Sequence, residues 1–171
     1  MNFSHEQSGF SLMEIMVTIA IIGILSAVTI VNYASIGKKN SVSLAAQNLS
    51  SDIHKTQSYA LNGKIVGTNK GYWGVYFDKD NNGKYIIFAD NDQDNLRDSG
   101  DTDYQVVNLP KGVKIMDVHP SAQISLVYAP PDPKIAINPG AVSSAMIGLS
   151  NYDDTNTKVI EVNIFGLVDV D

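Results

Sequence analysis

The chain has 171 residues, 44% of them hydrophobic and 18% charged, with a formal net charge of −6 and no cysteine. These values are typical of one ordered domain with an appendage, and they exclude a disulfide framework, a thiol nucleophile and a cysteine-based zinc site. From Ser41 onward there are 16 acidic and 10 basic residues. An acidic domain without a lysine- or arginine-rich run repels a phosphate backbone, so we expect no nucleic acid partner.

An almost continuously apolar segment, GFSLMEIMVTIAIIGILSAVTIV, runs from Gly9 to Val31. About twenty helical residues cross the hydrocarbon core of a bilayer, so we expect a transmembrane helix over residues 10–36. A cleaved secretory signal would have a basic start and a shorter apolar core. The leader MNFSHEQSG has no lysine or arginine, which disfavours that alternative.

A single acid, Glu14, stands inside this apolar segment. A plain membrane anchor is the simplest interpretation of the segment, but it gives no reason for the carboxylate. An acid at mid-bilayer costs about 2.5–3.5 kcal/mol on insertion scales, and such a residue marks a functional position by default.

The string GFSLMEI followed by AIIGIL resembles the N-terminus of type IV pilins and pseudopilins. The resemblance covers Gly9 to Tyr33. It implies that a prepilin peptidase cleaves after Gly9 and methylates the new N-terminal residue, Phe10. It also implies that Glu14 pairs with the N-terminal amine of a neighbouring subunit in a filament. A desolvated carboxylate and a desolvated ammonium offset one another, and such a pair would specify the axial register of the subunits.

The chain departs from the family's pattern in two places. Its leader lacks the usual basic residues, so the signal that orients the segment in the membrane is weak. A proline that many members carry near the end of the span is absent, and Val31 stands in the matching position. The helix therefore has no obligatory kink there.

Apolar residues then recur every three to four positions, at Val42, Ala45, Ala46, Leu49, Ile53 and Ala60. This spacing predicts an amphipathic helix over residues 37–63 that ends at Gly63 and is separated from the first segment by a softer SIGKKNS patch. His54 is expected on the solvent side of this helix rather than in a metal site.

The pattern changes to period two after the helix, which predicts an antiparallel β domain over residues 64–171. YWGVYF places Trp73, Val75 and Phe77 on one face, and KYIIFA follows a turn in which Gly83 is expected to supply a positive φ. Further strands are expected at YQVVNL, VKIMDV, QISLVY, AMIGLS, KVIEVNIF and LVDV, with turns at APPDPK and NPG. The expected class is α+β, with a pilin-like long N-terminal transmembrane and amphipathic helix packed on an antiparallel β-sheet domain.

The segment order from Leu44 to Val170 resembles the GspH/FimT group, which comprises minor pseudopilins of type II secretion and minor pilins of type IV pili. The resemblance rests on GYWGVYFD, IIFAD, a loop with RDSGD, and VNIFGLVDV. It implies a leader at residues 1–9 and a single-pass plasma (inner) membrane protein whose β domain lies outside the cytoplasm. Its implied partners are other pilin or pseudopilin subunits, the prepilin peptidase and an inner-membrane assembly platform.

The acidic segment DNDQDNLRDSGD, residues 90–101, offers oxygen ligands at the spacing of an EF-hand loop. The candidate calcium ligands are the carboxylates of Asp90, Asp92, Asp94, Asp98 and Asp101 and the carbonyl of Leu96. Against calcium, Asn95 stands where glycine is wanted, Asp101 is shorter than the usual glutamate, and the flanks look like strands. The alternative is a solvated loop whose side chains hydrogen-bond their own backbone. Both interpretations stay open, and no other cofactor is expected.

No catalytic arrangement is indicated, because HExxH, phosphate-loop and dinucleotide motifs are absent and one of the three histidines, His5, lies in the leader. We therefore expect a structural subunit of a type II secretion pseudopilus or a type IV pilus, not an enzyme. The alternative is a minor pilin that acts as a receptor for DNA uptake or surface adhesion. The acidic tail FGLVDVD disfavours the DNA-binding form of that alternative.

Overall fold

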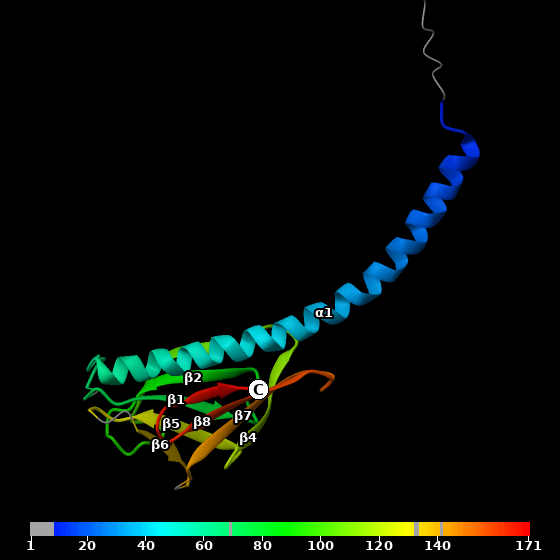
Figure 1. The fold of residues 1–171 in the computed structure, drawn as a ribbon. Coiled ribbons are helices and arrows are strands. Elements are labelled where there is room, and N and C mark those ends of the chain that lie inside the picture. The colour runs from blue at the N-terminus through cyan, green and yellow to red at the C-terminus, as the bar shows by residue number, and fades with distance from the viewer. Residues whose placement is uncertain (1–8, 69, 132–133, 141) are drawn as a thin grey trace, which may run out of the picture. The chain divides into compact units, whose positions relative to one another are not determined.

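The computed structural model describes residues 9–68, 70–131, 134–140 and 142–171, with the backbone alone for residues 28–39. A helix, α1 (Leu12–Leu61), comes first in the chain order (Figure 1). The strands that follow are β1 (Trp73–Asp78), β2 (Lys84–Ala89), β3 (Thr102–Asn108), β4 (Val113–His119), β5 (Gln123–Tyr128), β6 (Ile135–Asn138), β7 (Ser144–Asn151), β8 (Thr157–Asn163) and β9 (Val168–Val170). The α+β class with antiparallel sheets is thereby confirmed.

The chain divides into two compact units, one ending at Gly37 and one running from Lys38 to Asp171. The helical backbone of α1 is nevertheless continuous from Leu12 to Leu61. The boundary between the units falls inside SIGKKNS, where the sequence predicts a softer patch, and the helix continues through it. A lone glycine such as Gly37 costs only about 1 kcal/mol in a helix interior, which is too little to interrupt a long helix.

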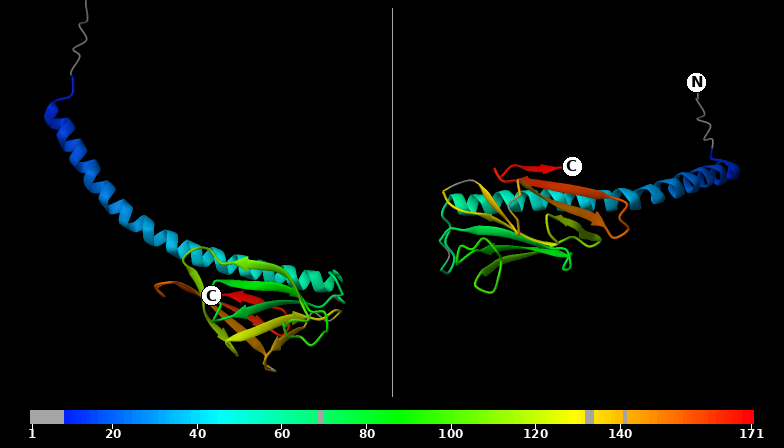
Figure 2. Two further views of the ribbon diagram at one scale, coloured as in Figure 1. Left: turned by 180° about the vertical axis from the view of Figure 1, so that it is seen from behind. Right: turned by 90° about the horizontal axis from the view of Figure 1, so that it is seen from below.

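The strands of the second unit form two antiparallel sheets. The five-stranded sheet has the order β3-β2-β1-β5-β6, and the four-stranded sheet has the order β4-β7-β8-β9. In the first sheet β1 is central, with Trp73 opposite Ala89 on one side and Tyr128 on the other. Figure 2 shows the two sheets from further sides, with the part of α1 that belongs to this unit running beside the strands.

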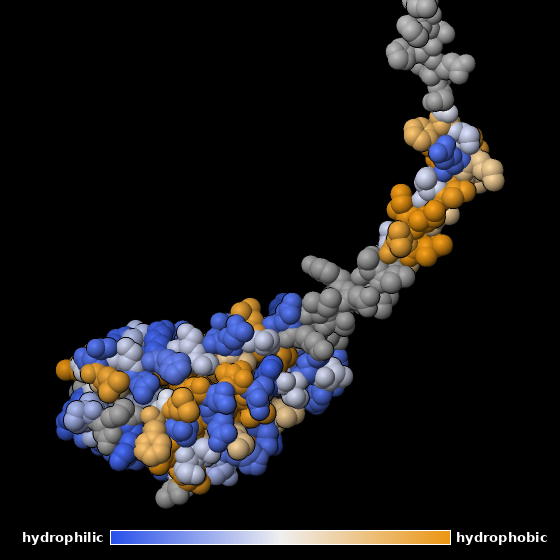
Figure 3. All heavy atoms as spheres, viewed as in Figure 1, coloured by the Kyte–Doolittle hydropathy of each residue, from blue (hydrophilic) through white to orange (hydrophobic). Residues whose placement is uncertain are grey.

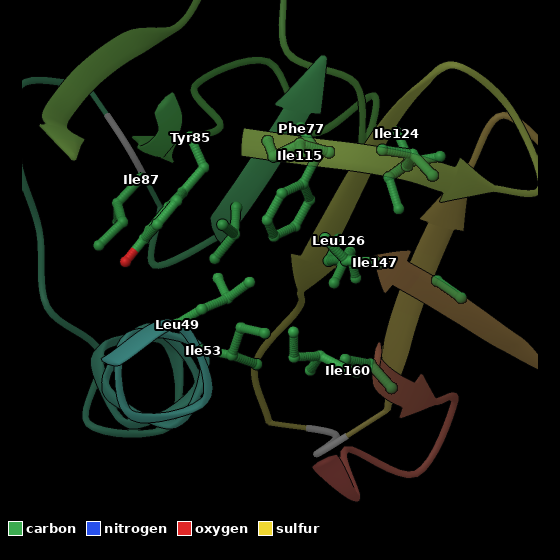
Figure 4. Close-up of a cluster of buried hydrophobic side chains, with 14 of the residues drawn as sticks. Leu49, Ile53, Phe77, Tyr85, Ile87, Ile115, Ile124, Leu126, Ile147 and Ile160 are labelled. Carbon is green, nitrogen blue, oxygen red and sulfur yellow. The ribbon is translucent and has the colours of Figure 1, made fainter. Parts of the chain in front are cut away.

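The second half of α1 contributes one face to the core. The six apolar positions that the sequence assigned to this face are each at most 2% exposed: Val42, Ala45, Ala46, Leu49, Ile53 and Ala60. Figure 4 shows Leu49 and Ile53 pointing from the helix toward the side chains of the strands. Burying a side chain the size of Val42, Leu49 or Ile53 stabilises the fold by about 1.5–3 kcal/mol, so this stripe holds the helix against the sheets. His54 is exposed, as predicted.

The strands supply the other side of the core. Trp73, Val75 and Phe77 are fully buried on one face of β1, which confirms the period-two prediction. The four-stranded sheet contributes residues such as Ile115 and Ile147 to the same core. Because the helix and both sheets share these contacts, the residues from Lys38 onward form a single packed unit.

The five-stranded sheet also buries side chains on its opposite face. Ile86, Phe88 and Val127 form a small second cluster, and Phe88 is fully buried. Gly74 makes room for it, because a Cβ at that position would lie 2.5 Å from two atoms of the Phe88 ring. Strand β2 is therefore buried on both faces, whereas an ordinary hairpin strand exposes one of its faces to solvent.

Three details of the β domain differ from the sequence-based expectations. Strand β6 was not predicted, because its four residues stand between two proline-rich turns. Strand β8 ends at Asn163 rather than Phe165, because the Asn163 Oδ1 accepts hydrogen bonds from the backbone N–H groups of Phe165 and Leu167 and closes a turn. Gly83 is not among the glycines with positive φ, so its expected role in the β1–β2 turn is wrong.

The close approach at Gly74 predicts a large effect of one added methyl group. Gly74→Ala should lower the free energy of unfolding by about 1–3 kcal/mol, because the Phe88 ring must move within a packed cluster. Gly83→Ala is the matched control, since a Cβ there meets no atom within 4 Å. Denaturant unfolding of both variants measures the difference. Equal stability of the two variants would contradict the described packing of β1 on Phe88.

Candidate functional site

The residues around the predicted cleavage point precede the helix. Gly9, Phe10 and Ser11 have no regular secondary structure, and α1 begins at Leu12. Phe10 is 82% exposed, so the described chain covers little of it. The structure therefore presents the Gly9–Phe10 peptide bond in an accessible segment next to a helix start.

Ser11 caps this helix. Its Oγ accepts a hydrogen bond from the backbone N–H of Glu14 at 3.3 Å, and its carbonyl accepts from the N–H groups of Glu14 and Ile15 at 3.1 and 3.3 Å. Ser-x-x-Glu is the capping-box spacing, in which the acid occupies the third helical position. The capping role of Ser11 is a functional detail that the Ser11-x-x-Glu14 spacing could have indicated from the sequence.

Glu14 is exposed in the first turn of α1. A carboxylate there interacts favourably with the positive end of the helix dipole. The acid thus has a local role in starting the helix, which does not depend on any partner. A role in subunit pairing is an additional proposal and needs a test that separates the two.

The described part of the first unit's helix exposes many apolar side chains, and Figure 3 shows them on the face turned to the viewer. The exposed large apolar residues of this region are Phe10, Leu12, Met13, Ile15, Met16, Val17, Ile19, Ile21, Ile22, Ile24 and Leu25. A helix that is apolar all round is typical of burial in a larger assembly or a membrane. Nothing in the described part of this unit covers it.

Among the residues that the structure describes, no helix is both long enough and apolar enough to cross a membrane. The transmembrane helix predicted over residues 10–36 is therefore not confirmed. The side chains of residues 28–39, on which much of that prediction depends, lie outside the described part of the chain.

The acidic loop between β2 and β3 is organised by Asp90, which is fully buried. Its two carboxylate oxygens accept hydrogen bonds from the backbone N–H groups of Gln93 at 2.6 Å and Asn95 at 3.0 Å. Gln93 and Asn95 both have positive φ, 68° and 63°, a conformation that non-glycine residues rarely adopt. Asp90 thus stabilises a strained loop, and its burial differs from the exposed loop that the sequence suggested.

Burial raises the pKa of Asp90 to about 6, although its two backbone hydrogen bonds act in the opposite direction. The nearby charges of Asp101 and Asp92 add to the increase. Burial likewise raises the pKa of Asp101, whose oxygens accept from the backbone N–H groups of Asn91 and Asp98 at 2.9 and 3.1 Å. The loop therefore concentrates negative charge that its own backbone only partly offsets.

The remaining acids of the loop bond the backbone just after them. Asp92 accepts from the N–H of Asp94, Asp94 from the N–H of Leu96, and Asp98 from the N–H of Gly100. These are the local side chain–backbone bonds that an Asp-rich loop forms without a metal. The structure thus shows the side chain–backbone hydrogen bonds that were expected for a loop without calcium.

The loop lies against the second face of the five-stranded sheet rather than projecting freely. The backbone N–H of Arg97 donates to Ser125 Oγ at 3.1 Å, and its guanidinium lies 5.0 Å from the centre of the Tyr76 ring. The guanidinium also donates to both oxygens of Asp103 at 2.7 Å, which lowers the pKa of that carboxyl. Asn138 Nδ2 donates to the carbonyl of Asn95 at 2.9 Å, so β5 and β6 both fix the loop.

Three of the six predicted calcium ligands come together. The carboxylate oxygens of Asp90, Asp92 and Asp94 lie within 4.8 Å of one another, with Asp92 and Asp94 exposed. Asp98 and Asp101 do not join that group among the described residues, and Leu96 is 42% exposed. Carboxylate oxygens suit calcium, but three ligands are fewer than the six to eight that it takes.

Comparison with protein families shows that residues 4–30 match the prokaryotic N-terminal methylation motif. The motif indicates a type IV pilin-like precursor, and its match spans the predicted cleavage point and Glu14. Comparison with curated proteins gave no match, and comparison with solved structures gave none either. The match does not extend to the β domain, so it does not distinguish the GspH/FimT group from other pilin-like groups.

The raised pKa of Asp90 predicts a pH-dependent stability. Because the pKa is higher in the folded state than the usual unfolded value near 3.9, the contribution of Asp90 is fully present below about pH 4 and is lost as the pH rises through about 6. Relative to Asp90→Asn, the wild type should gain about 2–3 kcal/mol of unfolding free energy between pH 7 and pH 4. Unfolding in the presence of a chelator measures this. Asp98→Asn is the exposed control, and a pH-independent difference for Asp90→Asn would contradict the described burial.

The calcium interpretation stays a prediction, and the geometry sharpens its test. If calcium binds, Asp92→Asn should weaken binding about tenfold or more, because Asp92 belongs to the group of three carboxylates and its side chain is exposed. Asp98→Asn should change the affinity much less. Calorimetric titration of the full chain with calcium chloride decides the matter, and no binding heat at millimolar calcium would end the proposal.

Proposed function

We propose that this chain is a structural minor pilin or pseudopilin subunit that is processed by a prepilin peptidase and assembled into a filament. The observation that carries the proposal is the methylation motif at residues 4–30, which includes the start of α1 and its exposed apolar side chains up to Leu25. A structural subunit accounts for both features, whereas an enzyme would account for neither.

The exposed apolar surface of the first unit supports an assembly role. Eleven large apolar side chains of this region, from Phe10 to Leu25, are about half exposed or more. Contiguous apolar surface of this kind marks a protein or membrane contact. In the proposed filament these side chains pack against the same helices of neighbouring subunits, and before assembly the segment at residues 10–36 lies in the inner membrane.

Glu14 has a second role in this proposal. Cleavage after Gly9 creates an amine at Phe10, and Glu14 of a neighbouring subunit pairs with it. In an apolar surrounding each of these charges alone is unfavourable, so the pair favours the one axial register in which both are matched. The capping bond of Ser11 does not supply this selectivity, because it is made within one chain.

The finer assignment rests on the resemblance of the β domain to the GspH/FimT group. We propose a leader at residues 1–9, a membrane and filament helix at 10–36, its amphipathic continuation at 37–63 and a β domain at 64–171 that lies outside the cytoplasm. The partners are other pilin or pseudopilin subunits and the inner-membrane assembly platform of a type II secretion system or a type IV pilus. A receptor role of the same subunit in adhesion or DNA uptake is the second candidate.

Three substitutions separate the capping role of Glu14 from its pairing role. Glu14→Gln retains the capping-box pattern but removes the charge, so it should lower the fraction of subunits in filaments about tenfold or more, because the neighbouring amine is left unpaired. Ser11→Ala removes the cap and keeps the charge, at about 0.5–2 kcal/mol of helix stability, and should assemble nearly normally. Glu14→Ala should behave like Glu14→Gln. Filament fractions are measured by shearing and immunoblotting.

The same measurement distinguishes a filament subunit from a plain membrane anchor, in which Glu14 has no pairing role. If Glu14→Gln assembles normally, the pairing role fails. If Ser11→Ala fails as severely as Glu14→Gln while the amount of membrane-bound protein is unchanged, the acid acts through helix initiation alone.

A further inference from the structure

Three aromatic rings meet at the end of α1 in the second unit. Tyr59 comes from the last turns of the helix, Trp73 opens β1, and Tyr104 belongs to β3. The ring centres lie 5.0 Å apart for Tyr59 and Trp73, 5.1 Å for Trp73 and Tyr104, and 5.8 Å for Tyr59 and Tyr104. The two pairs that include Tyr104 are nearly perpendicular, so these rings pack edge to face and are not stacked.

The ammonium of Lys64 lies inside this arrangement. Its Nζ is 3.6 Å from the centre of the Tyr59 ring, 4.1 Å from that of Tyr104 and 5.2 Å from that of Trp73. Nζ also donates a hydrogen bond to Tyr104 Oη at 2.8 Å. All three distances are within the range in which a cation is attracted to the face of an aromatic ring.

The backbone holds Lys64 in place independently of its charge. Its N–H donates to the carbonyl of Tyr59 at 2.9 Å, and its carbonyl accepts from Trp73 Nε1 at 2.7 Å. Gly63, with a φ of 62°, makes the reversal after the helix that places Lys64 over the rings. The rings are therefore positioned by the fold, and the side chain of Lys64 lies against the side of the ring cluster that it would leave uncovered if it were removed.

We propose that Tyr59, Trp73 and Tyr104 form a cation-binding cage for an alkylammonium group, which Lys64 fills from within the chain. Aromatic rings recognise quaternary ammonium groups because attraction to a ring face does not require a hydrogen-bond donor, so such a group would do without the bond that Lys64 donates to Tyr104 Oη. Trp73 is fully buried and Tyr104 is 40% exposed, so the cage has an inner wall and an open side. Lys64 is then an intramolecular competitor of any external alkylammonium ligand. This inference does not depend on the proposed filament role.

Removing the Lys64 side chain tests the cage directly. Trp73 is the single tryptophan of the chain and lines the cage, so its fluorescence reports occupancy. The full chain is studied in maltoside micelles, which carry no ammonium group, and is titrated with choline chloride at constant ionic strength. Lys64→Ala should bind choline in the millimolar range, about tenfold or more tighter than the wild type.

Two controls show whether charge and rings are needed. The neutral carbon isostere of choline should not bind Lys64→Ala, and adding Tyr104→Ala should remove choline binding. A Lys64→Ala protein that is folded by circular dichroism but does not bind choline would overturn the proposal. Equal binding of choline and its neutral isostere would also overturn it, because the site would then be only an apolar pocket.

A second measurement needs no substitution and covers the case in which Lys64→Ala does not fold. Reductive dimethylation of the wild type with isotope-labelled formaldehyde keeps the charge of each lysine and adds an NMR signal. The methyl signals of Lys64 should be shifted upfield by the surrounding rings, while those of the exposed Lys70 should not. Unshifted Lys64 signals would show that its ammonium does not occupy the cage.

Discussion

The apolar stripe from Val42 to Ala60 is the interaction on which the folded domain depends. A single helix face covers the core that the two sheets would otherwise leave open to water. Truncating one of its large side chains, such as Leu49 or Ile53, removes about 2–5 kcal/mol, a large share of the stability of a domain of this size. The helix is thus a structural part of the β domain as well as the element that leads into it.

The same helix carries a different surface from Leu12 to Leu25. In this part of the helix the apolar residues are not confined to one face, and the large side chains are exposed. Exposure of this apolar surface to water is unfavourable. The surface becomes favourable only where lipid or other helices surround it, which agrees with the methylation motif at residues 4–30. The change from an all-round to a one-sided apolar pattern along one helix is therefore the physical link between the domain and the proposed assembly.

Much of the fold could be predicted because its residues follow simple periodicities. The buried stripe of α1 and the buried face of β1 were predicted residue by residue. Strand β6 was missed because four residues between turns are too few to show a period. The burial of Asp90 could not be predicted either, because it belongs to a loop that Arg97 joins to Ser125 and Tyr76, which are distant in the sequence. The cage around Lys64 was missed for the same reason, since its three rings come from separate elements.

The processing of the N-terminus offers the most direct test of the pilin-like role. Mass spectrometry of the mature protein from its native membrane identifies the first residue and any modification on it. Cleavage by a prepilin peptidase predicts a chain that begins at Phe10 and carries one methyl group on its N-terminal nitrogen. A mature chain that still begins at Met1, or one cut after the apolar segment as a secretory signal would be, would contradict the role proposed for this protein.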